Sequence, residues 1–227
     1  MKVHTKETQE KLTPRKALEI LQDGNTRFVN NLKTQRDLLA QVNETREGQW
    51  PFAVILSCID SRTSSELVFD QGLGDIFSVR IAGNIVNTDI IGSLEFACKI
   101  AGSKIIVVLG HNKCSAVKGA CDHLEMGNLT ELLSKLQPAV YQENQTKENR
   151  TSENEDFVQN VAKINVRRSV ESIIERSYIL EHMLESGSVG IVGAMYDVSS
   201  GLIEICTDSF YIKDEISPQL SFANFRH

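Results

Sequence analysis

Cysteine, histidine, aspartate and arginine gather in two short stretches of this sequence, each directly after an apolar run. Cys58, Asp60 and Arg62 alternate after the first run, and His111 and Cys114 follow the second. Two thiolates and one imidazole satisfy three corners of a zinc tetrahedron and leave the fourth to water. A neighbouring aspartate can accept a hydrogen bond from that water, and a bidentate arginine keeps the carboxylate ionised and oriented. These residue types therefore point to a metal-assisted reaction of activated water.

The spacing alone leaves other interpretations open. A lone histidine and cysteine after a strand serve equally well as packing or capping residues. A structural zinc site needs a fourth protein ligand at short spacing, and the chain has no C-x-x-C pair, so catalysis is favoured over a structural ion. A thiol phosphatase needs more than the three residues that separate Cys58 from Arg62, and the sequence lacks a P-loop pattern.

The elements that must position these residues are predicted from apolar periodicity. Apolar residues predict strands over Phe52–Ser57, Ile76–Ile81, Lys104–Leu109 and Val189–Met195. The third is continuously β-branched and apolar, which is typical of a parallel sheet buried on both faces. Helical patterns alternate with them, as over Thr88–Ala101. We therefore expect an α/β fold with a central, mostly parallel β-sheet flanked by helices. The carboxyl ends of neighbouring parallel strands would bring Cys58, His111 and Cys114 together.

Further signals mark the ends of elements. Thr13 and Pro14 open a helix with its apolar side before Gly24, and the capping-box pattern at 63–66 opens another. Residues 199–201 predict a turn into a strand over Leu202–Cys206, which gives a C-terminal hairpin. The polar run 142–156 predicts a solvated loop.

Length and composition predict one α/β domain over residues 1–227. We divide it into an N-terminal helical arm (1–50), a catalytic core (51–207) and a C-terminal extension (208–227). Part of the arm, residues 25–50, suits either an embrace of a neighbouring subunit or a helix lying on its own core.

Charge and cysteine content narrow the partners and the compartment. The net charge of -6 argues against nucleic acid, and the absence of a long apolar stretch argues against membrane spanning. The first residues lack the apolar core of a secretion signal, and five irregularly spaced cysteines do not form a disulfide framework, so we expect a cytoplasmic protein.

Four segments together resemble the β-class carbonic anhydrases. They are C-I-D-S-R at 58–62, G-H-N-K-C at 110–114, and the intervening FSVRIAGN and SLEFA, and the resemblance covers roughly residues 13–207. It implies a Zn²⁺ enzyme that interconverts carbon dioxide and bicarbonate through zinc-bound hydroxide. The implied ligands are Cys58, His111 and Cys114, with Asp60 and Arg62 as the catalytic pair beside the metal.

The resemblance also implies substrate-binding residues. Gln49 matches the glutamine that binds substrate in the plant-like variant, whereas Phe77, Phe96 and Ala82 match positions along the substrate cleft. Ile55 stands where the other variant, which has a noncatalytic bicarbonate pocket, carries tryptophan, so an open site is favoured. Core packing also explains the two phenylalanines, and Gln49 also fits an ordinary loop residue.

Other positions and other functions remain as alternatives. Glu66 and Arg80 align with the bicarbonate pocket of that second variant, or each simply forms an ion pair. The same zinc chemistry suits carbon disulfide or carbonyl sulfide as the substrate. A nonenzymatic bicarbonate-responsive zinc protein is a further interpretation, but the intact Asp60 and Arg62 argue against it.

The resemblance implies a homodimer or homotetramer. Two thiolate ligands predict activity that rises through mildly alkaline pH.

Overall fold

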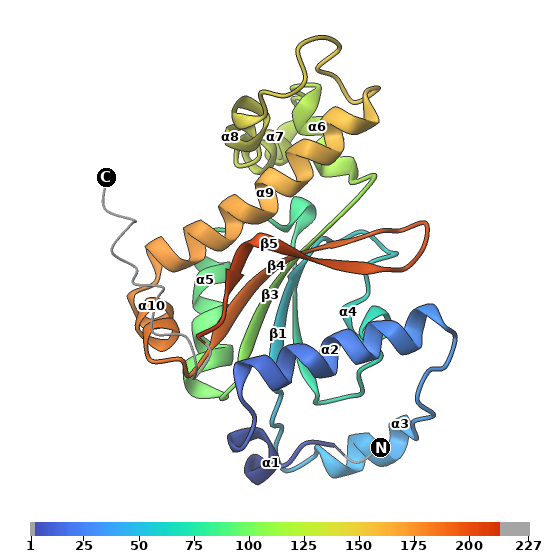
Figure 1. Ribbon diagram of the computed structural model, residues 1–227, viewed down its shortest axis with the longest axis vertical. Coiled ribbons are helices and arrows are strands. Elements are labelled where there is room, and N and C mark those ends of the chain that lie inside the picture. The colour runs from blue at the N-terminus through green and yellow to red at the C-terminus, as the bar shows by residue number, and fades with distance from the viewer. Residues whose placement is uncertain (1–2, 214–227) are drawn as a thin grey trace.

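The computed structural model describes residues 3–213, which form one central five-stranded sheet with helices on both faces (Figure 1). The strands lie in the order β2-β1-β3-β4-β5, in which β5 alone is antiparallel to its neighbour. Their bounds are β1 (Ala53–Ser57), β2 (Ile76–Arg80), β3 (Ile105–His111), β4 (Gly190–Tyr196) and β5 (Ile203–Tyr211). The predicted α/β fold with a mostly parallel sheet is confirmed.

Two hydrophobic clusters cover the two faces of the sheet. One contains residues of α5 (Thr88–Glu95), α6 (Ser115–Cys121), α8 (Gln137–Gln142), α9 (Glu155–Arg176) and α10 (Tyr178–Glu185). The opposite cluster contains residues of α2 (Pro14–Val29) and α4 (Ser65–Val68), and Figure 1 shows α2 crossing its face of the sheet. The first cluster also contains residues of α7 (Gly127–Ser134) and of the π-helical turn η2 (Phe96–Ile100). The other helices are α1 (Lys6–Glu10), α3 (Leu38–Glu44) and the short 3₁₀-helix η1 (Ala82–Asn84).

The central strands alternate between these clusters. Val54 and Ile106 face the α9 side, whereas Ile55 and Ile105 face the α2 side, and all four are fully buried. Side chains of successive strand residues point to opposite faces, so a strand buried on both sides must be apolar throughout. This is the physical reason why continuous apolar runs predicted the sheet correctly.

The predicted C-terminal hairpin is confirmed, but its second strand is longer than expected. Its turn closes where the amide of Asp197 donates to the carbonyl of Leu202, at 2.9 Å. The strand continues past Cys206 to Tyr211, which pairs with Ile191 on β4. The apolar signal ends at Thr207 because β5 lies at the edge of the sheet, where backbone pairing continues without a buried side chain at every position.

The predicted end of the second helix near Gly24 is wrong. Thr13 caps α2 as predicted, since its hydroxyl accepts from the amide of Lys16 at 3.2 Å. The helix then runs through Gly24 to Val29. A Cβ at Gly24 would lie 1.8 Å from the carbonyl oxygen of Phe69, so this glycine permits close packing instead of ending the helix.

The predicted capping box at 63–66 is also wrong. Ser64 occupies the cap position of the short α4 but makes no side-chain capping bond. The hydroxyl of Thr63 donates instead to the carbonyls of Cys58 and Asp60, at 3.1 and 2.9 Å, while Glu66 accepts from Ser78 at 2.6 Å. Thr63 therefore ties the turn after β1 together, which bears directly on the candidate site.

Other predicted segments agree in outline. The helix predicted over Thr88–Ala101 begins at Thr88, and its last turn is π-helical before Gly102, whose φ of 84° suits a helix end. The polar run 142–156 connects α8 to α9 and folds around an ion pair between Arg150 and Glu143, at 2.6 Å.

The N-terminal residues contact the core of their own chain. Three α2 residues are buried against the sheet, and Arg36, in the segment after α2, pairs with the buried Asp70 at 2.5 Å. The strand β5 crosses the expected boundary at 207, and the expected extension lies outside the described residues from 214 onward. No helix among residues 3–213 combines the length and apolarity needed to cross a membrane.

Candidate metal centre

The sheet brings Cys58, His111 and Cys114 to one edge. The strands β1 and β3 are parallel neighbours, with Ser57 paired to Leu109. Cys58 directly follows β1, His111 is the last residue of β3, and Cys114 is the N-cap residue of α6. Loops at the carboxyl ends of parallel strands leave the sheet on the same side, which explains why residues so far apart in sequence meet.

The geometry of the three side chains suits a tetrahedral ion. The sulfur atoms of Cys58 and Cys114 lie 3.9 Å apart, and one donor atom from each of the three residues lies within 4.8 Å of the others. Zinc–sulfur bonds of about 2.3 Å give a tetrahedral edge of roughly 3.8 Å, close to the observed sulfur separation. All three residues are at most 4% exposed.

The ring of His111 presents one nitrogen for coordination. Its Nδ1 lies 2.8 Å from the carbonyl oxygen of Asn112, so Nδ1 carries the proton and donates. Its Nε2 is buried without a hydrogen-bond partner among residues 3–213. A buried nitrogen lone pair without a partner is costly in a folded protein, and a metal ion would satisfy it.

Lys113 supplies the backbone reversal between two candidate ligands. Its φ of 54° lies in the left-handed region, which a residue with a side chain seldom adopts. The reversal lets His111 end the strand while Cys114 starts the next helix, with both facing the same point. The sequence carries no signal of this strained conformation.

The two thiols cannot both ionise without a compensating cation. A hydrogen bond from the Cys114 thiol lowers the pKa of Cys58 to about 4, although burial acts in the opposite direction. The amide of Gly83, at 3.4 Å, also lowers this pKa. The sulfur of Cys58, together with burial, raises the pKa of Cys114. A divalent cation bound between the sulfurs would stabilise both thiolates, so the donor set fits zinc.

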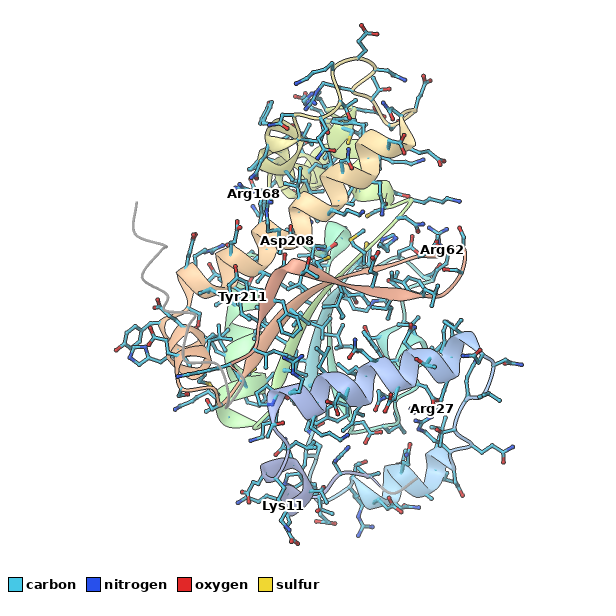
Figure 2. All side chains as sticks on the ribbon, viewed as in Figure 1. Lys11, Arg27, Arg62, Arg168, Asp208 and Tyr211 are labelled. Atoms are coloured by element: carbon cyan, nitrogen blue, oxygen red, sulfur yellow. The ribbon has the colours of Figure 1, made fainter. Side chains whose placement is uncertain are left out.

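Asp60 and Arg62 form a bidentate ion pair beside this cluster. Arg62 donates from Nε to Oδ1 at 2.9 Å and from Nη2 to Oδ2 at 2.8 Å, and its backbone amide donates to Oδ1 at 3.0 Å. The hydrogen bonds from Arg62 lower the pKa of Asp60 to about 2. Figure 2 shows Arg62 at the end of the sheet where the β4–β5 hairpin turns.

Arg80 holds the turn that carries two candidate residues, a role that sequence analysis missed. Its Nε donates to the carbonyl of Cys58 at 3.0 Å, and its Nη2 donates to the carbonyl of Asp60 at 2.6 Å. Glu66 accepts a hydrogen bond from Ser78, so neutral partners, and not the ion pairs expected as one alternative, hold these two side chains among the described residues. A residue type alone does not reveal bonds to backbone carbonyls.

The predicted substrate residues lie in different places. Ala82 begins η1, next to Gly83, and therefore adjoins the cluster. Gln49 is exposed in the segment before β1. Phe77 and Phe96 pack edge to face with ring centroids 6.4 Å apart.

The aromatic pair lies along the sheet from the strand end that carries Cys58. Phe77 pairs with Val54, and Cys58 lies four residues further along, which is about 13 Å at the rise of a β-strand. Phe96 is 54% exposed and Ile100, one turn later, is 73% exposed. The substrate roles predicted for these positions remain predictions.

Comparison with known proteins places the chain in a family. The family described as carbonic anhydrase matches residues 53–203. A carbonic anhydrase of Mycolicibacterium smegmatis is 32% identical over 199 residues, covering 85% of this chain and 93% of that protein. Carbonic anhydrase 2 of Mycobacterium tuberculosis is 33% identical over 195 residues, covering 83% and 90%.

A solved structure agrees in fold. One of two tetrameric β-carbonic anhydrases from Sordaria macrospora has a TM-score of 0.65 at 25% identity, covering 73% of this chain and 85% of that one. The fold is that of the β class of carbonic anhydrases, and the described residues include a cysteine–histidine–cysteine cluster that could hold a metal ion. The chain belongs to the carbonic anhydrase family.

Proposed function

We propose that this protein catalyses the reversible hydration of carbon dioxide to bicarbonate and a proton, with Zn²⁺ held by Cys58, His111 and Cys114. The observation that carries the proposal is the meeting of these three buried donors beside the Asp60–Arg62 pair. Zinc bound there would act as a Lewis acid that turns water into a nucleophile near neutral pH.

The chain's own residues prepare the site for that chemistry. The two sulfurs supply negative charge and soft donors, while the Asn112 carbonyl keeps the proton of His111 on Nδ1 and leaves Nε2 for the ion. Arg62 keeps Asp60 ionised, so its carboxylate can only accept hydrogen bonds. We assign Asp60 the task of accepting the remaining hydrogen of the nucleophile and directing its lone pair toward carbon dioxide.

We further propose that the site rests in an open state. A closed state requires Asp60 to leave Arg62 and occupy the fourth position, whereas three hydrogen bonds join the two residues here. Ile55 and Gln49 agree with the plant-like variant. The carboxylate therefore serves as an acceptor beside the site and not as a fourth ligand.

The substrate cleft is proposed to lie between two copies of the chain. Phe77 pairs with Val54, about 13 Å along the strand from Cys58, and Phe96 is more than half exposed. Contact with a second copy would bury this apolar surface and place both rings at the partner's cluster. We accordingly propose a homodimer or a homotetramer, a state in keeping with the tetrameric Sordaria macrospora relatives.

The cysteines bear on the redox compartment in which the protein works. All five cysteines, each within the described residues, are free, which supports a reducing compartment such as the cytoplasm. A soluble gas and its hydrated anion are the proposed partners, and neither nucleic acid nor a membrane is needed.

The experiment pairs zinc content with carbon dioxide hydration by stopped flow in wild type and Cys58→Ser. We expect one zinc per chain and hydration in wild type, with both greatly reduced in the variant. Full activity of a zinc-free variant would reject the proposal. Hydrolysis of carbon disulfide or carbonyl sulfide without hydration of carbon dioxide would favour the alternative substrate class, and bound zinc with neither activity would favour the nonenzymatic alternative.

A further inference from the structure

The peptide that orients His111 is itself fastened to the β4–β5 hairpin. The carbonyl of Asn112 accepts from His111 Nδ1, and the backbone amide of Asn112 donates to the carbonyl of Tyr196 at 3.2 Å. The side chain of Asn112 makes two more bonds, with Nδ2 donating to Asp197 Oδ1 at 2.7 Å and Oδ1 accepting from the amide of Val198 at 2.9 Å. Three hydrogen bonds therefore fix this residue against a segment more than eighty positions away.

Asp197 lies at the centre of the hairpin turn. Its Oδ1 accepts from the amide of Ser199 at 2.8 Å as well as from Asn112, while its Oδ2 accepts from the hydroxyl of Ser200 at 2.9 Å. The turn closes through the amide of Gly201, which donates to the Asp197 carbonyl at 2.8 Å. One carboxylate thus joins the turn to the peptide behind the candidate ligand.

We propose that Asn112 and Asp197 are positioning residues of the metal site, acting through the Asn112 carbonyl to fix the tautomer and direction of the His111 ring. The inference rests on the proposed zinc site. Neither side chain touches the cluster, and their effect passes through one backbone carbonyl.

The physical need for such a support comes from the imidazole. A neutral ring carries its proton on either nitrogen, and only the Nδ1–H form leaves Nε2 free to bind. A carbonyl fixed 2.8 Å from Nδ1 selects that form, whereas a carbonyl free to tilt would not. Because Lys113 has a left-handed φ of 54°, the Asn112–Lys113 peptide is strained and needs restraint from outside the loop.

The test measures zinc release to a chromogenic chelator from the zinc-loaded protein. Asn112→Ala and Asp197→Ala are expected to weaken zinc affinity about 10- to 100-fold, the usual effect of losing an outer partner of a ligand. Asp197→Asn keeps an oxygen acceptor for Asn112, and it should stay much closer to wild type. The Asn112→Ala/Asp197→Ala double variant should lose little more than either single variant, because both changes break one link.

Ser200→Ala is the matched control for the turn. It removes the hydrogen bond that the Ser200 hydroxyl donates to Oδ2 of the same carboxylate, and it leaves the link to Asn112 in place. We expect it to keep wild-type zinc affinity. Urea unfolding of all variants separates a general loss of stability from a loss at the site, and the absorption bands of Co²⁺-loaded protein report the ligand geometry directly.

Two results would overturn the inference. One is wild-type zinc release and Co²⁺ bands in Asn112→Ala, and the other is an equal loss of zinc affinity in Ser200→Ala and Asp197→Ala. Either result, with zinc still bound by wild type, would leave the proposed function intact. Wild type that binds no zinc would instead reject the proposed function itself.

Discussion

Arg62 contacts both carboxylate oxygens of Asp60 through its Nε and Nη2 atoms, at 2.9 and 2.8 Å. The two residues lie in the turn directly after β1. The backbone amide of Arg62 donates to Oδ1 of Asp60 and so holds that side of the carboxylate in place. Only the planar guanidinium fork makes both contacts at once. The orientation of Asp60 therefore depends on the shape of its partner and not on charge alone.

Replacing that fork tests the orientation. Arg62→Lys keeps the positive charge but loses one of the two charge-assisted hydrogen bonds that orient the carboxylate. We expect the rate constant for carbon dioxide hydration to fall roughly 10- to 100-fold with zinc content unchanged, measured by stopped flow and metal analysis. Arg46→Lys, at an exposed pair with Glu47, is the control and should behave as wild type. Equal activity in Arg62→Lys and wild type would remove Asp60 orientation from the account.

The pH dependence of hydration tests the donor set. Two thiolates cancel the charge of the ion, so they acidify bound water less than a site of three neutral histidines, where water titrates at about 7. We expect the rate constant to rise as pH increases from neutral into the mildly alkaline range. The measurement is stopped-flow hydration across pH in buffers of constant ionic strength, and a flat profile would contradict the assignment.

A buried carboxylate away from the site gives a separate prediction for stability. Burial opposes ionisation of Asp70, but hydrogen bonds from Arg27 and Arg36 outweigh it and lower the pKa to about 2. A depressed folded-state pKa stabilises above the unfolded value of about 4, and this contribution is lost as pH falls toward 2.

Asp70→Asn should therefore lower the free energy of unfolding by about 3 kcal/mol at pH 7, because two arginines lose a buried partner. Urea denaturation at several pH values measures this difference, which should shrink as pH falls from 4 toward 2. A difference that stays constant over that range would show that the ion pairs do not carry the effect.

The packing of α2 on α4 predicts a strong effect of one methyl group. Gly24→Ala places a Cβ 1.8 Å from the carbonyl oxygen of Phe69, so the helix must move away from the core. We expect a loss of about 2 kcal/mol or more in the free energy of unfolding, at the upper end of overpacking effects. Gly92→Ala in α5 is the matched control, since nothing lies within 4 Å of its added Cβ, and it should be neutral or stabilising.

Local pattern predicted the parts of the structure that local pattern determines. The three buried parallel strands β1, β3 and β4 follow from apolar runs, and the convergence of Cys58, His111 and Cys114 follows from parallel neighbours. The Thr13 cap follows from residue type at a helix start.

The errors arose where distant contacts decide. The role of Gly24 is set by the Phe69 carbonyl, which lies too close to leave room for a side chain. Thr63 donates a hydrogen bond within the turn after β1 instead of capping a helix. The support that Arg80 and Asn112 give the site passes through backbone carbonyls, to which any residue type contributes. A pattern of side chains cannot predict such bonds.

The most direct test of the account is zinc K-edge X-ray absorption on the purified wild-type protein. We expect two sulfur neighbours at about 2.3 Å and nitrogen or oxygen neighbours at about 2.0 Å, with total coordination of four. Cys114→Ser should remove one sulfur and leave the other. Zinc surrounded only by nitrogen and oxygen, or a protein that holds no zinc, would contradict the proposal that these three side chains bind the ion.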